Sequence, residues 1–188
     1  MAAKKPASLD LASLYAVGIE LSKQVDYDVA DLDRVAKAAK IPLSRLKTHF
    51  VDFKHYLIVM QQCFLDELRD EVIKITNSVP PGIERVHRAT TVYLDHCLKR
   101  RPLRDWLLRA RRAEPQLAEG LRRQNQAFVL IISTEFHSLR WPYPMAAARL
   151  FLAAIQEAAR LEHAKGAPLP HIREAIWEIA RHYAGAAR

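Results

Sequence analysis

The sequence contains little glycine and little cysteine. Among its 188 residues there are five glycines and two cysteines. So few glycines, beside many Ala, Leu, Arg and Glu residues, favour helix along the whole chain. Cys63 and Cys97 lie in segments of apolar periodicity and have neither metal-ligand nor redox spacing. We therefore expect two buried thiols in a reducing compartment, and a disulfide or redox pair is the less favoured alternative.

Long apolar runs are also missing from the sequence. No segment is long enough to span a bilayer, and the first ten residues lack the apolar core of a secretory signal. The sequence therefore predicts a cytoplasmic protein with no membrane partner. Its formal net charge of +8 favours an anionic partner, although the charge alone does not identify which kind.

Motifs of the common enzyme classes are missing as well. The chain has no glycine-rich phosphate loop, no nucleophile elbow and no paired-histidine metal motif. Its eight histidines are scattered and form no tight cluster with cysteine or aspartate. We therefore expect no catalytic activity, no metal site and no cofactor.

Prolines divide the chain into segments that have the apolar periodicity of helices. All ten lie between these segments or at their first or second residue, where proline is tolerated at a helix start or just past a helix end. The longest segment places Leu57, Met60, Phe64 and Leu68 on one helical face. The sequence shows no alternating strand pattern and no internal repeat. It predicts an all-α fold of about nine helices, over residues 8–24, 30–39, 42–49, 52–77, 83–99, 102–112, 115–139, 145–165 and 169–183.

Two short segments before the longest one have the size of a helix-turn-helix. Residues 30–39 carry an apolar stripe of about two turns. In the second segment, residues 42–49, the side chains of Leu46 and of the following Phe50 are expected to point inward. Two short helices joined by a tight turn, and braced by a preceding helix, are the minimum for such a motif. The same pattern is common in all-α proteins, so by itself it favours a plain helical corner over DNA binding.

The stretch DYDVADLDRVAKAAKIPLSRLKTHFVDFKHYLIVM, residues 26–60, carries a more specific pattern. Its informative residues are Tyr27, Leu32, Val35, Ala36, Ala39, Ile41, Leu46, His49, Phe50 and Leu57. In these positions the stretch resembles, without gaps, the DNA-binding segment of the TetR family of bacterial repressors. The resemblance covers about the first third of the chain. It implies a helix-turn-helix DNA-binding domain over residues 1–52 and a helical domain for effector binding and dimerisation over residues 53–188, joined by a long fourth helix.

Several residues depart from the pattern of that family. Lys40 stands where the family has its turn glycine, and Pro42 replaces the serine that caps the recognition helix. Leu43 replaces a polar residue, and Lys47 replaces a tyrosine that contacts phosphate. Since the apolar scaffold residues are kept, these departures bear on the mode of DNA contact more than on the fold.

Basic residues gather around the expected recognition helix. From Arg34 to Lys54 there are six bases and one acid, Asp52, and such a basic edge suits the phosphates of DNA. The resemblance implies double-stranded DNA with a palindromic operator as the partner. The residues expected to contact it are Lys40, Leu43, Ser44, Arg45, Lys47, Thr48, His49 and Lys54.

The resemblance also implies a pocket for a small-molecule effector in the second domain. Such pockets are mostly apolar and hold a few polar anchors. For each candidate, a place in the ordinary core or on the surface is the favoured alternative, and the effector cannot be identified from the sequence. The candidates are Met60, Phe64, Tyr93, Cys97, Trp106, Phe128 and Phe136, with His96, Arg109 and His137 as anchors.

The alanine-rich residues 145–161 and the last predicted helix favour a homodimer, because small side chains let helices approach closely. The apolar contacts are expected from Phe151, Leu152, Ile155, Ile176 and Trp177. Two functions follow. The first is a transcriptional regulator, expected to be a repressor, whose operator affinity is controlled by a small molecule. The alternative is a TetR-like protein that binds a ligand, a lipid or a partner and has lost specific DNA binding.

Overall fold

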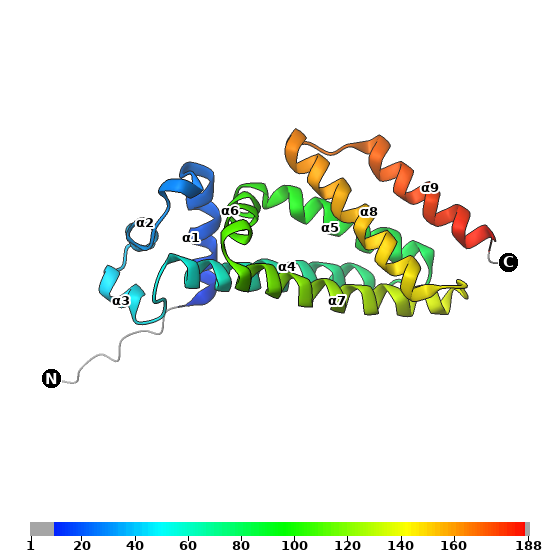
Figure 1. The fold of residues 1–188 in the computed structure, drawn as a ribbon, viewed down its shortest axis with the longest axis horizontal. Coiled ribbons are helices and arrows are strands. Elements are labelled where there is room, and N and C mark those ends of the chain that lie inside the picture. Colours follow the sequence, from blue (N-terminus) through cyan, green and yellow to red (C-terminus); the bar gives the residue numbers. More distant parts are fainter. Residues whose placement is uncertain (1–9, 187–188) are drawn as a thin grey trace. The chain divides into compact units, whose positions relative to one another are not determined.

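The computed structural model describes residues 10–186, with side chains as far as residue 182 (Figure 1). Over this range the chain forms nine α-helices and one short 3-10 helix, and contains no strand. The all-α prediction is confirmed, and the helix bounds agree with the predicted ones to within three residues; residues 8 and 9 of the first predicted helix lie outside the described range. The elements are α1 (Leu11–Gln24), η1 (Tyr27–Val29), α2 (Leu32–Ala38), α3 (Leu43–Lys47), α4 (Phe53–Thr76), α5 (Ile83–Lys99), α6 (Arg101–Ala113), α7 (Pro115–Ser138), α8 (Pro144–Lys165) and α9 (Pro170–Ala186).

The chain divides into two compact units. Unit 1 consists of Met1–Phe64 and Pro102–Leu117, and unit 2 consists of Leu65–Arg101 and Ala118–Arg188. Two of the divisions fall inside α4 and α7, so these helices supply residues to both units. The functional boundary between residues 52 and 53 remains a prediction, because packing does not test which residues contact DNA.

Unit 1 is closed by α6, which joins it from a later part of the sequence. The Trp106 indole N–H donates to the carbonyl of Val25, at 3.0 Å, and this bond fixes the end of α1. The Gln61 side chain donates to the carbonyl of Leu117, at 3.0 Å, and accepts from Nε of Arg111, at 2.7 Å. The packed interior of this unit includes Leu14, Val35, Leu46, Phe50, Tyr56, Leu57, Met60, Trp106 and Leu107.

The turn between α2 and α3 ends α2 in a Schellman motif. The N–H of Ile41 donates to the carbonyl of Ala36, at 3.0 Å, and the N–H of Lys40 donates to the carbonyl of Lys37, at 3.1 Å. Lys40 has a φ of 55°, which is the left-handed region where glycine is favoured. The residue that replaces the family's turn glycine is therefore a lysine in a conformation that its Cβ disfavours.

Replacing Lys40 by glycine is expected to raise the free energy of unfolding by about 1 kcal/mol, because the left-handed penalty of a Cβ disappears. Urea unfolding followed by circular dichroism measures the change. Lys37→Gly is the matched control, since Lys37 lies within α2, where glycine costs about 0.5–1 kcal/mol. A Lys40→Gly protein that is less stable than the wild type would contradict the expectation.

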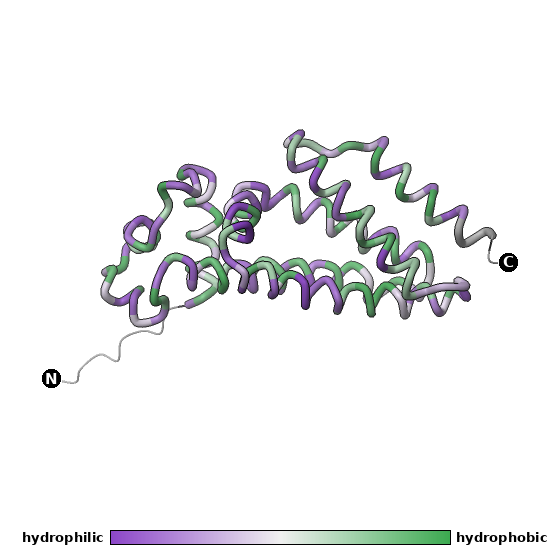
Figure 2. The backbone as a smooth tube through the Cα atoms, viewed as in Figure 1, coloured by the Kyte–Doolittle hydropathy of each residue, from purple (hydrophilic) through white to green (hydrophobic). Residues whose placement is uncertain are grey.

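Unit 2 is built from α5, α8 and α9 together with the larger parts of α4 and α7. Helix α8 contacts both α5 and α9, and α5 also contacts α9 (Figure 1). Alanines at 147, 148, 158 and 159 are buried in α8, and their small side chains allow this close packing. Hydrophilic residues recur along each of these helices (Figure 2), and none of the described helices combines the length and apolar character needed to cross a bilayer.

One ion pair of unit 2 has its carboxylate inside the protein. The Glu162 side chain is 1% exposed and accepts from Nε and Nη2 of Arg173, at 2.7 and 2.8 Å, and from the N–H of Leu169, at 2.9 Å. Burial opposes ionisation of Glu162, but these hydrogen bonds outweigh it and hold the carboxyl pKa below its usual value. Nη1 of Arg173 lies 2.6 Å from Asp95, so the guanidinium connects α9 with both α8 and α5.

The two cysteines lie in different units, and both carry free thiols. Cys97 of α5 is buried, as predicted, whereas Cys63 of α4 is only half-buried. The expectation of two buried thiols is therefore correct for one of them.

Candidate nucleic-acid interface and ligand cavity

The expected recognition segment forms the short helix α3, which ends at Lys47 with Thr48 as its C-cap. Leu46 and Phe50 are 0% and 2% exposed, and they pack the segment against the rest of unit 1. The Thr48 hydroxyl donates to the carbonyl of Arg45, at 2.8 Å, which closes the last turn. The opposite side is polar and basic. Its exposed side chains are Lys40, Ser44, Lys47, Thr48 and His49, and Leu43 and Arg45 beside them are half-buried.

The lysines around α3 differ in whether their charge is already paired. Lys40 and Lys47 are exposed and form no ion pair with any described residue. Lys54 forms an ion pair with Glu114, the residue that follows α6, and the hydrogen bond within this pair raises the pKa of Lys54. Lys40 and Lys47 are thus the lysines of the predicted set whose charge is open to a phosphate.

Arg109, which was expected to anchor an effector, lies in unit 1 instead. Its guanidinium is 2.9 Å from Asp26, 3.2 Å from Asp28 and 3.1 Å from Asp105. It therefore neutralises negative charge on the aspartates that precede α2 and attaches η1 to α6. Trp106, from the same helix, is buried in the interior of unit 1 and bonded to the carbonyl of Val25.

A cavity of about 350 Å³ lies within unit 2, between α4, α5, α7 and α8. This volume falls in the lower part of the range that small-molecule sites occupy. Two of the predicted effector residues, Tyr93 of α5 and Phe128 of α7, line it. Most of the wall is apolar and includes Leu68, Val72, Ile132, Phe151, Leu152 and Ile155.

The cavity wall also contains an ion pair whose two residues were not among those predicted from the sequence. Arg85 of α5 and Glu135 of α7 form an ion pair, and their side chains are 27% and 16% exposed. A signal for both was present, because Arg85 lies eight residues before Tyr93 and Glu135 lies seven after Phe128. Residues at these spacings share a helical face, so extending the two predicted faces by two turns leads to the pair.

The other predicted effector residues lie away from this cavity. Met60 and Phe64 belong to the interior of unit 1, and Cys97 to that of unit 2. Phe136 is turned from the cavity and stacks on Trp141, with ring centroids 3.9 Å apart. His137 is exposed at the end of α7.

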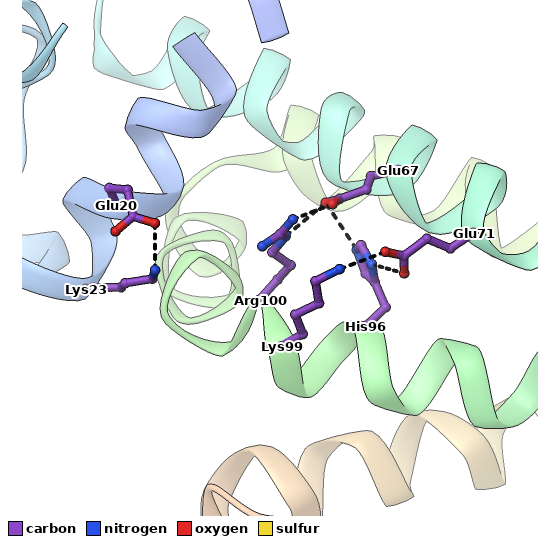
Figure 3. Close-up of polar contacts among 7 residues, drawn as sticks. All are labelled: Glu20, Lys23, Glu67, Glu71, His96, Lys99 and Arg100. Carbon is purple, nitrogen blue, oxygen red and sulfur yellow. Dashed lines mark hydrogen bonds and ion pairs between the residues drawn. The ribbon is translucent and has the colours of Figure 1, made fainter. Parts of the chain in front are cut away.

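His96 belongs to a polar cluster between α4 and α5 (Figure 3). Its Nδ1 lies 2.9 Å from Glu71 and its Nε2 lies 3.9 Å from Glu67. Burial lowers the pKa of His96, although the bond to Glu71 opposes this shift. Glu67, Glu71 and His96 bring possible metal ligands within 4.8 Å of one another. However, Lys99 and Arg100 already pair with the two carboxylates, so the cluster acts as a cross-link between the helices.

Comparison with known proteins places the architecture among bacterial regulators. No protein-family model and no curated protein matches the sequence. A transcriptional regulator from Rhodococcus sp. Rha1 matches with a TM-score of 0.77 and 16% identity, over 94% of this chain and 97% of that one. A TetR-family regulator from Syntrophomonas wolfei matches with a TM-score of 0.74 and 11% identity, over 93% and 94% of the two chains.

A fatty acid degradation regulator, FadR, from Bacillus halodurans matches with a TM-score of 0.73 and 12% identity, over 95% of this chain and 96% of that one. At such identities the agreement concerns the fold. The chain therefore has the fold of the TetR-family transcriptional regulators along nearly its whole length, and the resemblance predicted from residues 26–60 is confirmed at this level.

Proposed function

We propose that this chain is a DNA-binding transcriptional regulator of the TetR family, in which a small molecule in the cavity of unit 2 controls operator affinity. The observation that carries the proposal is the polar and basic face of α3, exposed on unit 1 of a chain that has this fold. The protein acts in the cytoplasm as a repressor. A ligand changes operator affinity only by the difference in its affinity for the free and DNA-bound states.

The residues of α3 have separate roles in this proposal. Leu46 and Phe50 hold the helix in place, and Ser44, Lys47 and Thr48 face the major groove. Lys47 contacts either a phosphate or a guanine edge, and Leu43 meets a thymine methyl group. Phosphate contacts fix the position of the protein, whereas base contacts select the sequence.

A homodimer supplies the second recognition helix for a palindromic operator, whose half-sites lie about 34 Å apart. The residues expected to form its interface need correction. Phe151, Leu152, Ile155 and Ile176 are 4–8% exposed because they pack within unit 2. Trp177 is half-buried in a tilted contact with His87, ring centroids 4.2 Å apart, and its place in the interface remains a prediction. The apolar side chains that remain exposed on α8 and α9 include Leu150, at 74%, and Ile179, at 65%. We propose these two as interface contacts.

The proposal is tested by fluorescence anisotropy with DNA from the region upstream of the chain's own gene, over a series of salt concentrations. If Lys47 contacts a phosphate, Lys47→Ala is expected to reduce the slope of log affinity against log salt by about one unit per subunit. If it contacts a base, the loss is about 1–3 kcal/mol at one operator position. Lys23→Ala is the control, because Lys23 is an exposed lysine of α1 that already pairs with Glu20 (Figure 3).

The opposite outcome is equally informative. Light scattering and circular dichroism first establish that Arg45→Ala and Lys47→Ala proteins are folded dimers. If both then bind the DNA as the wild type does, or if the wild type binds no such DNA, α3 does not recognise an operator. The alternative function would then describe the chain better: a TetR-like protein that binds a ligand, a lipid or a partner and has lost specific DNA binding.

A further inference from the structure

We propose that the cavity of unit 2 takes an uncharged, mainly apolar molecule whose polar group both donates and accepts a hydrogen bond, such as an amide or an alcohol. This inference rests on the proposed function, because it takes the cavity to be the effector site. It adds the chemical class of the effector. The residues that carry it are Arg85 and Glu135, the ion pair in the cavity wall.

The Arg85–Glu135 pair has both a donor and an acceptor to spare. The hydrogen bond between them runs from Nη2 of Arg85 to Oε1 of Glu135. Nε of Arg85 and Oε2 of Glu135 are buried and have no hydrogen-bond partner among the described residues. A buried polar atom without a partner is costly, so a ligand group that donates a hydrogen bond to Oε2 of Glu135 and accepts one from Nε of Arg85 removes both costs.

The rest of the wall offers little to an ionic group. The hydroxyls of Thr76 and Thr90 donate to carbonyls of their own helices. Arg69, the other charged residue of the lining, pairs with Asp66 and Asp70. Since Arg85 and Glu135 neutralise each other, an anionic or cationic ligand would enter an apolar cavity without an unpaired counter-charge.

A carboxylate is excluded by a second argument. It can accept from Nε of Arg85, but it has no hydrogen to donate to Oε2 of Glu135, and its negative charge would lie beside that of Glu135 in a half-buried position. An amide or an alcohol leaves the ion pair intact and adds one hydrogen bond to each of its two partners. The apolar part of the ligand lies along α4, where the lining from Leu68 to Thr76 extends over about 12 Å.

The test is isothermal titration calorimetry of the full chain with four eight-carbon probes: octanamide, octan-1-ol, octanoate and octylamine. Octanamide and octan-1-ol are expected to bind about tenfold more tightly than the two ions. Glu135→Gln leaves the charge of Arg85 unpaired, so octanoate is expected to gain about tenfold in affinity while octylamine does not. Glu84→Gln is the matched control, because Glu84 forms an exposed ion pair with Arg88, and both residues lie on α5, the helix that carries Arg85.

A second variant keeps the inference testable if Glu135→Gln does not fold. In the Arg85→Met, Glu135→Leu protein the pair becomes apolar, and no lone charge is left. Octan-1-ol and heptyl methyl ether are isomers, but the ether cannot donate a hydrogen bond. The alcohol is expected to bind the wild type about tenfold more tightly than the ether and to lose this advantage in the double variant.

The outcomes separate this inference from the function on which it rests. If octanoate binds the wild type most tightly, or if the alcohol and the ether bind equally, the assigned ligand class is wrong while the cavity remains a ligand site. If none of the probes binds, or if their binding survives Ala89→Trp, which fills the cavity, the effector site itself is wrong.

Discussion

Arg173→Met is expected to lower the free energy of unfolding by about 3–5 kcal/mol, because it leaves the buried carboxylate of Glu162 without its partner. The bond from the Leu169 N–H remains, but it cannot replace the charge of the guanidinium. Urea unfolding followed by circular dichroism measures the loss. The Glu162→Met, Arg173→Met double variant removes both charges and is expected to recover most of the stability.

The exposed pair of Glu157 and Arg160 provides the matched control. Their side chains are 54% and 62% exposed, and the residues lie three apart on α8. Arg160→Met is therefore expected to change the free energy of unfolding by about 1 kcal/mol at most. Equal losses in Arg160→Met and Arg173→Met would show that burial of Glu162 does not set the size of the effect.

The pH dependence of the two proteins should have opposite signs. In the wild type the pKa of Glu162 lies below its ordinary value of 4.5. That contribution to stability is present above the unfolded pKa and is lost as pH falls through the lower folded value. In Arg173→Met, burial acts without the guanidinium and raises the Glu162 pKa above the unfolded value. The variant therefore gains stability as pH falls from 7, and its deficit should be smaller near about pH 5.

Gly18→Ala is expected to destabilise unit 1 by about 1–3 kcal/mol, although alanine favours helix by about 0.5–1 kcal/mol. A Cβ at this position of α1 would lie 2.5 Å from the Tyr56 hydroxyl oxygen and 3.2 Å from the sulfur of Met60. The Tyr56 ring cannot withdraw, because it is fully buried and packs against Phe50 and Phe53. Its hydroxyl also donates to the carbonyl of Leu14, at 3.2 Å, and this bond would be strained.

Tyr56→Phe isolates the cause of that loss. The Tyr56 hydroxyl oxygen is the atom closest to the added Cβ, and Tyr56→Phe removes it. The steric cost then no longer offsets the higher helix propensity of alanine. Gly18→Ala is then expected to be neutral or stabilising by up to about 1 kcal/mol in the Tyr56→Phe background. If the cost of Gly18→Ala is the same in both backgrounds, the contact with the hydroxyl is not its source.

The helices could be predicted from the sequence because their signals are local. Proline and apolar periodicity act within a few residues, and they place the ends of α5 at Ile83 and Lys99 as observed. The inward positions of Leu46 and Phe50 follow from the same short-range pattern. The place of Lys40 at the family's turn glycine was also visible in the sequence, and its φ of 55° is a conformation that favours glycine.

The cavity could be predicted only in part because its wall is assembled across the sequence. Arg85 and Glu135 lie fifty positions apart, and no local spacing relates them. Phe136 shows how sensitive such a prediction is, since one step along α7 turns a side chain by about 100°. It therefore stacks on Trp141, while its neighbour Glu135 faces the cavity. Arg109 was misplaced for a similar reason, because its partners Asp26 and Asp28 come from the far end of unit 1 in sequence.

The closure of unit 1 by α6 bears on the order in which the nascent chain can fold. When the ribosome has made the helix-turn-helix, the chain still lacks Trp106 and Leu117, which bond to Val25 and Gln61. Another 53 residues follow Phe64 before Leu117 is complete, and at about 5–20 residues per second they take roughly 3–10 s to synthesise. During this interval the apolar side chains that later meet α6 are exposed to chaperones and to other nascent chains. The helix-turn-helix therefore matures only after the ribosome has also made α5, so the folding of unit 1 is timed by a segment that belongs to unit 2.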